Sequence, residues 1–169
     1  MTRCYILFGS NQGDSMTLLE QACVLINNRC GLLAERSSAY LTEPWGFEAD
    51  TWFLNALLAV ETELEPDAMM DALMEIEGRL GRVRHPETEG YRSRTVDLDI
   101  LYYGDRIVRT EKVTVPHPRL HLRRFALMPL CELIPDFLHP VFNRSQQQLL
   151  DSCNDTSTVK PFDTTTQQP

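Results

Sequence analysis

The clearest alternation of hydrophobic and polar positions lies at residues 94–101, which read Arg-Thr-Val-Asp-Leu-Asp-Ile-Leu. A β-strand has a side-chain period of two, so the apolar residues would share one face and Asp97 and Asp99 the other. At roughly 3.3 Å of rise per residue, these two residues would lie about 6.6 Å apart along the strand, close enough for both carboxylates to bind one Mg²⁺ or a pair of ions. The pattern therefore predicts a strand with one core-facing side and one acidic side.

Apolar residues at strand or helix spacing predict the remaining elements. Together their order allows a ferredoxin-like α+β sandwich. The expected strands cover residues 4–8, 32–41 and 52–63, the helices cover 14–28, 66–80 and 119–132 with a break at Pro129, a hairpin-like return covers 106–111, and 113–118 is extended.

The length and composition bound the class of protein. A chain of 169 residues suits one domain with a sizeable core, which we place at residues 1–150. The remainder, 151–169, is rich in Thr, Ser and Gln and is expected to be a flexible tail. No apolar run reaches the roughly 18 residues that a membrane-spanning helix needs. Five cysteines, an odd number without C-x-x-C spacing, argue against a disulfide framework or a zinc site and are typical of a reducing cytoplasm.

Charge is distributed unevenly along the chain. The net charge of −8 divides into −10 for residues 1–78, +5 for 79–124 and −3 for 125–169. A nucleic-acid-binding domain is usually basic throughout. A cationic region within an acidic protein fits a small polyanion such as a nucleotide better.

The best candidate for a functional site is the stretch in which Asp97 and Asp99 follow Arg92 and Arg94, because metal ligands and cations would lie close together there. Anionic oxygens held by metal ions and guanidinium groups are what phosphoryl transfer requires. The alternative is a half-solvated sheet face without chemistry, which is common for an alternating strand. The sequence contains neither G-x-x-x-x-G-K-[ST] nor G-x-G-x-x-G, so it supports neither a P-loop nor a Rossmann site.

Several short motifs follow one another in a specific order. They are Gly-Ser-Asn at 9–11, Thr-x-Pro at 42–44, Phe-Leu-Asn at 53–55, Gly-Arg-Val-Arg at 81–84, the run 94–101, and Val115 to Phe125 followed by Pro129-Leu130. In this combination they resemble the 6-hydroxymethyl-7,8-dihydropterin pyrophosphokinase family of folate biosynthesis over about residues 3–140. The resemblance implies a three-layer α/β/α domain with a central antiparallel sheet. It also implies an ATP-dependent pyrophosphokinase that transfers pyrophosphate from ATP to the hydroxymethyl group of the dihydropterin and releases AMP.

The resemblance further implies a site for ATP and two Mg²⁺ ions. Asp97 and Asp99 would hold the metal ions, and Arg82 and Arg94 would join them in catalysis. The other implied nucleotide contacts are Glu77, Arg84, the backbone of Ile100, Lys112, Thr114, His117 and Arg123. The sequence departs from the common family residues at Met74, Tyr91, Arg92 and Pro118.

A pterin pocket is implied as well. Phe53 and Phe125 would stack on the two faces of the flat ring. Thr42 and Asn55 would bond to its edge, helped by the backbone at Glu43 and Trp45. Because a buried Asn needs partners, Asn55 is either satisfied within the fold or reads the edge of a heterocycle.

Two other functions stay open on the sequence. One is a different Mg²⁺-dependent Asp-x-Asp nucleotidyl or glycosyl transferase. The other is a ferredoxin-like module that binds RNA, which the acidic balance and the missing aromatic RNP pattern oppose. The expected protein is a cytoplasmic monomer that binds ATP and 6-hydroxymethyl-7,8-dihydropterin, with no nucleic acid or membrane partner.

Overall fold

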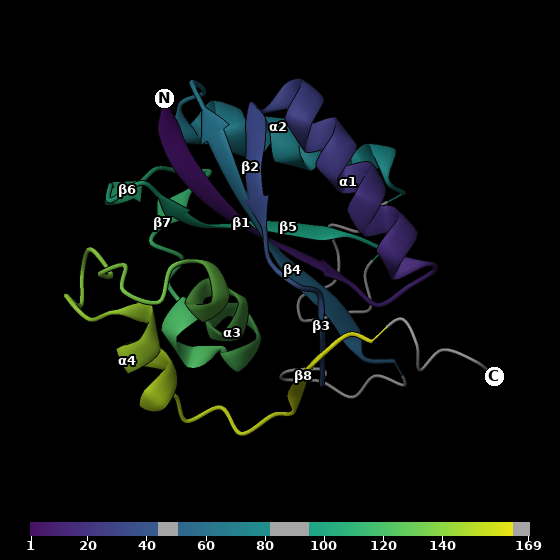
Figure 1. Cartoon of the computed structure of the whole chain (residues 1–169). Coiled ribbons are helices and arrows are strands. Elements are labelled where there is room, and N and C mark those ends of the chain that lie inside the picture. Colours follow the sequence, from purple (N-terminus) through teal and green to yellow (C-terminus); the bar gives the residue numbers. More distant parts are fainter. Residues whose placement is uncertain (44–50, 82–94, 164–169) are drawn as a thin grey trace.

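The computed structural model describes residues 1–43, 51–81 and 95–163. Both strands and helices occur along these residues (Figure 1). In chain order they are β1 (Thr2–Ser10), α1 (Ser15–Arg29), β2 (Leu32–Arg36), β3 (Tyr40–Thr42), β4 (Phe53–Thr62), α2 (Pro66–Arg79), β5 (Asp97–Tyr103), β6 (Val108–Arg109), β7 (Thr114–Val115), the 3-10 helix η1 (Leu120–Leu122), α3 (Arg124–Leu133), α4 (Gln146–Asp151) and β8 (Val159–Pro161).

The main sheet is six-stranded and has the order β5-β1-β4-β3-β8, with β2 also paired to β4. Its pairings are all antiparallel. Strands β6 and β7 form a separate two-stranded ribbon. Within the described residues β5 is an edge strand, so its outward backbone groups need partners from outside the sheet.

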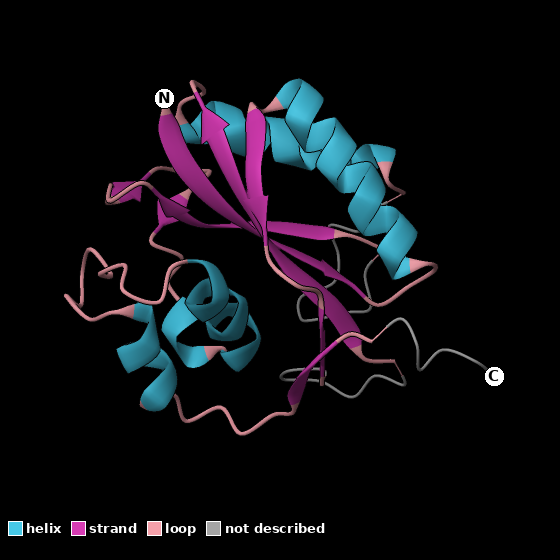
Figure 2. Ribbon diagram, viewed as in Figure 1, coloured by secondary structure: helices cyan, strands magenta, loops and turns pink. Residues whose placement is uncertain are grey.

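Helices cover both faces of the sheet (Figure 2). Helices α1 and α2 bury Ile26, Met69 and Leu73 against one face, together with Ile6 and Leu58 of β1 and β4. Helices α3 and α4 form a second core on the opposite face. Its buried members include Leu7, Leu57, Leu101, Leu127 and Leu149. The prediction of a three-layer α/β/α domain with a central antiparallel sheet is therefore confirmed.

The N-terminal half follows the predicted elements closely. Helix α1 begins after Asp14, whose carboxylate accepts hydrogen bonds from the amide and the hydroxyl of Thr17 at 3.1 and 2.8 Å. An acidic N-cap of this kind satisfies an amide that has no partner within the helix. The strand expected at 32–41 is divided into β2 and β3. At Ser37 between them, the amide donates to the carbonyl of Leu57 at 2.9 Å, and the side-chain hydroxyl accepts the Leu57 amide at 2.8 Å.

The C-terminal half differs more from the expectations. The helix expected at 119–132 consists of η1 and α3, because the residues before Arg124 form i→i+3 bonds, such as Arg123 N to Leu120 O at 3.2 Å. Pro129 lies within α3 without ending it. The segment expected as a flexible tail from 151 includes β8, which pairs with β3 through backbone bonds that a polar composition does not reveal. Among the described helices, none is long and apolar enough to cross a membrane.

A test of this packing is available at Gly31, between α1 and β2. Its φ is +140°, and a Cβ there would lie 2.2 Å from the backbone oxygen of Glu61. We expect Gly31→Ala to lower the free energy of unfolding by about 2 kcal/mol or more, because it combines a disfavoured backbone conformation with a clash against backbone. Urea unfolding followed by circular dichroism measures the change.

The matched control is Gly78→Ala in α2, where a Cβ meets nothing within 4 Å. Since alanine is the better helix former, this variant should gain about 0.5–1 kcal/mol. Equal stability of the two variants would contradict the account of Gly31.

Candidate active site

The two predicted carboxylates lie on β5 as the alternation requires. Asp97 and Asp99 are partly exposed, whereas Leu98 and Ile100 between and after them are buried in the core under α1 and α2. Asp99 lies opposite Leu7 of β1, which belongs to the core under α3. Because residues opposite each other on paired strands share a face, both carboxylates lie on the α3 side of the sheet.

Asp97 and Asn55 belong to one row across three strands. Gly9 of β1 lies opposite both Asn55 of β4 and Asp97 of β5. Since Gly9 has no side chain, no side chain of β1 stands between the amide of Asn55 and the carboxylate of Asp97 in this row. A Cβ at Gly9 would lie 3.0 Å from Nδ2 of Asn55. The Gly-Ser-Asn motif pointed to this position, but only the strand register shows what the glycine separates.

The two residues predicted at the pterin edge are joined to each other. Thr42 donates through its hydroxyl to Oδ1 of Asn55 at 2.8 Å, and both residues are buried. Asn55 in turn donates through Nδ2 to the carbonyl of Phe8 at 3.1 Å. An amide has two N–H donors and two acceptor sites on its oxygen, so these bonds fix the orientation of Asn55 and leave it capacity for a ligand.

The two predicted stacking rings lie on the same side of the sheet. Phe53 opens β4 and shares a face with Asn55, two residues further on. Phe125 is in the first turn of α3, and both phenyl groups are partly buried. The guanidinium of Arg123 lies 5.7 Å from the ring centroid of Phe125. The fold thus brings together the strand and the helix that carry these rings.

Glu77 of α2 provides a hydrogen-bond acceptor for a backbone amide on the outer edge of β5. Its side chain is 3% exposed, and Oε1 accepts the backbone N–H of Leu98 at 2.9 Å. Leu98 stands between the two aspartates. Glu77 was predicted as a nucleotide contact, and the structure gives it this bond to the strand that presents the carboxylates.

His117 provides a partner for a second backbone group on the same edge, because its amide donates to the carbonyl of Leu101 at 2.9 Å. Burial and, to a smaller extent, the positive charges of Arg123 and Arg119 together lower the pKa of His117 to about 4, against the opposing effect of Asp97. The imidazole is therefore neutral at pH 7. Its Nδ1 accepts the amide of Arg119 at 3.1 Å, so the ring proton is on Nε2.

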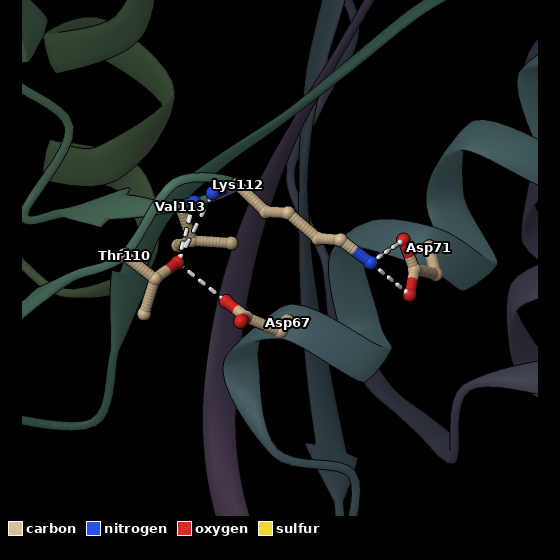
Figure 3. A network of polar contacts seen from close by, with 5 residues as sticks. All are labelled: Asp67, Asp71, Thr110, Lys112 and Val113. Carbon is tan, nitrogen blue, oxygen red and sulfur yellow. Dashed lines mark hydrogen bonds and ion pairs between the residues drawn. The ribbon is translucent and has the colours of Figure 1, made fainter.

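Lys112 is held by α2 (Figure 3). Its Nζ lies 2.8 and 2.7 Å from the two carboxylate oxygens of Asp71, and this partner raises the pKa of the lysine. Beside it, Thr110 donates to Asp67 and accepts the amides of Lys112 and Val113. Asp71 was not predicted as a partner of Lys112, and no local signal in the sequence indicates the pair, because the two residues are 41 positions apart.

The remaining predicted site residues differ in exposure and in whether they lie within the described part of the chain. Thr114 is exposed in β7, and the side chain of Ile100 is buried, which leaves its backbone as the predicted contact. The amide of Glu43 donates to the carbonyl of Thr158 at 3.2 Å. Trp45, Arg82, Arg84 and Arg94 lie outside the described residues.

The carboxylate pair fits a magnesium site. Among residues 1–43, 51–81 and 95–163, no group of three or more His, Cys, Asp and Glu side chains could hold a metal ion. Mg²⁺ commonly binds through one or two carboxylates and takes its other ligands from water and substrate phosphates. Asp97 and Asp99, partly exposed on one face, offer that donor set.

Comparison with known proteins gives a consistent result. Residues 5–135 match the family described as 7,8-dihydro-6-hydroxymethylpterin-pyrophosphokinase (HPPK). A 2-amino-4-hydroxy-6-hydroxymethyldihydropteridine pyrophosphokinase of Methylorubrum extorquens is 38% identical over 139 residues, covering 82% of this chain and 86% of the relative. Proteins of the same name from Porphyromonas gingivalis and Bacillus subtilis are 38% and 39% identical, covering 83% and 76% of this chain and 95% and 76% of theirs.

Solved structures agree on the fold. A crystal structure of an HPPK-DHPS in complex with substrates superposes with a TM-score of 0.73 at 16% identity, and covers 89% of this chain. The wild-type Plasmodium falciparum HPPK-DHPS with pteroate gives 0.73 at 15% identity and also covers 89%. This chain spans 43% and 44% of those two chains, so it corresponds to less than half of each.

The bond between Glu77 and β5 can be tested with two variants. Glu77→Gln keeps an oxygen that can accept the Leu98 amide, whereas Glu77→Leu leaves that buried N–H without this acceptor. We expect the leucine variant to lose about 1–3 kcal/mol more unfolding free energy than the glutamine variant, the usual cost of an unsatisfied buried donor. Chemical unfolding of both variants measures the difference, and equal values would show that the bond contributes little.

Proposed function

The chain belongs to the 7,8-dihydro-6-hydroxymethylpterin-pyrophosphokinase family, and on this basis we propose that it transfers pyrophosphate from ATP to the hydroxymethyl group of 6-hydroxymethyl-7,8-dihydropterin, releasing AMP. It is thus an enzyme of folate biosynthesis. The observation that carries the proposal is the match over residues 5–135, which includes both aspartates of β5 and the Thr42–Asn55 pair. A different Asp-x-Asp transferase is not favoured, since the relatives share one name.

Asp97 and Asp99 are proposed to hold two Mg²⁺ ions with the ATP phosphates. Bound Mg²⁺ would supply neutralisation of phosphate charge during transfer. The two aspartates orient the site, because their backbone is fixed on one side by β1 and at Leu98 on the other side by Glu77. The nucleophile is the hydroxyl of the substrate, so the reaction depends on alignment and charge more than on a protein base.

The nucleotide is proposed to lie along the outer edge of β5. His117 is neutral and would donate from Nε2, while Lys112 and Arg123 supply positive charge. Lys112 can reach phosphate only by sharing or leaving Asp71, because its ammonium already contacts both oxygens of that carboxylate. The other proposed nucleotide contacts are Glu77, Thr114, the backbone of Ile100, Arg84 and Arg94. Arg82 is proposed to assist catalysis, together with Arg94.

The pterin is proposed to lie between Phe53 and Phe125 on the α3 side of the sheet. Two phenyl rings suit a flat heterocycle, because stacking is worth about 0.5–1.5 kcal/mol per pair beyond the buried area. Thr42 and Asn55 hold each other at the edge of this pocket, so the pterin would meet a fixed set of donors and acceptors. Backbone atoms at Glu43 and Trp45 would complete the edge.

We further propose that the enzyme works as a monomer in the cytoplasm, with small molecules as its only partners. The free state of all five cysteines supports this compartment, since a reducing cytoplasm keeps thiols unpaired. The net charge of −8 is of the sign that opposes binding to nucleic acid.

The experiment that tests the function is AMP release from ATP and Mg²⁺, with and without 6-hydroxymethyl-7,8-dihydropterin. We expect AMP only when the pterin is present. Asp97→Ala and Asp99→Ala should each lower turnover by about a hundredfold or more, because the metal contributes several kcal/mol of charge stabilisation. The control is Asp105→Ala, an exposed aspartate just after β5. AMP release without the pterin, or near-normal turnover in either variant, would contradict the proposal.

The stacking role of Phe125 can be tested separately by calorimetry. We expect Phe125→Ala to weaken pterin binding about tenfold, since it removes a stacked ring together with its buried area. The pterin is titrated in the presence of a non-hydrolysable ATP analogue, and the analogue is then titrated alone. Phe142→Ala, at a ring that is 43% exposed in the α3–α4 connection, is the control. Equal loss of both ligands would refute the assignment.

A further inference from the structure

The C-terminal segment, residues 152–163, lies beyond the part of the chain that matches the family. It nevertheless contacts two elements of the proposed pterin pocket, α3 and the edge strand β3. We propose that Asp155 of this segment is a positioning residue for that pocket, because it holds the first turn of α3, which carries Phe125, next to the strand that carries Thr42. The inference rests on the proposed function.

Asp155, which is distant in sequence, caps the N-terminal end of α3 in place of a side chain at the N-cap position. Arg123, which precedes the helix, has a guanidinium that cannot accept a hydrogen bond from the first turn. Instead Oδ2 of Asp155 accepts the amide of Arg124 at 3.0 Å, 31 residues away in sequence. The other oxygen accepts the amide of Ser157 at 3.0 Å and also its hydroxyl. The carboxylate is thus fixed between its own segment and the residue next to Phe125.

The charge state of Asp155 agrees with this role. Burial alone would raise the pKa of Asp155, but the hydrogen bonds from Ser157 and the contact with Arg124 lower it below its ordinary value. The group is therefore ionised at neutral pH. A negative charge at a helix N-terminus is favourable, because the amides of the first turn carry partial positive charge.

The same segment is bonded to β3, the strand that carries Thr42 at the edge of the proposed pocket. Strand β8 pairs with β3, and Val159 lies opposite Thr42. The carbonyl of Thr158 accepts the amide of Glu43, and at the far end the amide of Phe162 donates to the carbonyl of Ala39 at 2.8 Å. The C-terminal segment therefore joins the first turn of α3 to the proposed pterin-edge strand through backbone and carboxylate bonds. Figure 1 shows β8 of this segment beside β3.

The opposite end of α3 has an anchor of its own. Glu132 accepts the amide and hydroxyl of Ser38 at 2.8 and 2.9 Å, and the hydroxyl of Tyr40 at 2.5 Å. Because Glu132 already fixes the C-terminal end of the helix near β3, loss of Asp155 should affect mainly the N-terminal end. That is the end where Phe125 lies.

The test compares Asp155→Ala with Asp155→Asn, which keeps an oxygen that can accept the Arg124 amide. KM for the pterin, KM for ATP and kcat are measured by AMP release. We expect the alanine variant to raise KM for the pterin about fivefold, a change of the size that one N-cap carboxylate contributes. KM for ATP should change less, because Arg123 is one of many nucleotide contacts. The asparagine variant should restore most of the pterin KM.

Two further variants keep the test decisive. Asp151→Ala changes an exposed acid on α4, which accepts a hydrogen bond from the side chain of Gln147 in the same helix, and should leave both KM values unchanged. If Asp155→Ala does not fold, Ser157→Ala, which removes only one of the bonds to Asp155, should shift the pterin KM in the same direction.

The outcomes separate the two proposals. Equal rises in both KM values, no rise for the pterin, or an asparagine variant as impaired as the alanine variant would overturn the positioning role. Failure of the wild-type protein to release AMP with the pterin would overturn the proposed function, and the positioning role with it. A wild-type protein that works normally, beside an Asp155→Ala variant that does so too, would overturn the positioning role alone.

Discussion

The outer edge of β5 is the constraint on which the site depends. An edge strand leaves backbone donors and acceptors on its outer side, and burying them without partners is costly. Here Glu77 accepts the Leu98 amide and His117 donates to the Leu101 carbonyl, so α2 and the segment before η1 both meet β5 at this edge. The bonds that complete the strand are thus also the bonds that bring the proposed nucleotide contacts beside Asp97 and Asp99.

A second constraint is the missing side chain at Gly9. A row of directly opposed residues on neighbouring strands normally fills its face with side chains. Gly9 contributes no side chain at the central position, and a Cβ there would crowd Nδ2 of Asn55. The amide of Asn55 on one side and the carboxylate of Asp97 on the other are therefore neighbours across Gly9. One glycine in the middle strand places the proposed pterin edge next to the proposed metal ligands.

The sequence predicted those features that depend on local periodicity. The alternation around Asp97 and Asp99 predicted β5 and its acidic face, and the helix patterns predicted α1 and α2 within a few residues. It did not predict β8, because an edge pairing uses backbone groups that any composition provides. The Lys112–Asp71 ion pair was also missed, since it depends on how the β6–β7 ribbon lies against α2. For the pocket, the motifs named Thr42 and Asn55, while only the structure shows that they bond to each other.

The contacts that fix the two ends of α3 are hydrogen bonds to the carboxylates of Glu132 and Asp155. Its buried face packs against the sheet through residues such as Leu127 and Leu130, and such contacts are non-directional. They hold the helix on the sheet but do not by themselves fix how its ends lie along β3. At one end Glu132 accepts the hydroxyl of Tyr40 in β3, and at the other Asp155, in the segment that leads into β8, accepts the amide of Arg124. A pocket that must stack a flat ring needs its walls set in angle as well as in distance, and bonds with defined geometry at both helix ends can provide that.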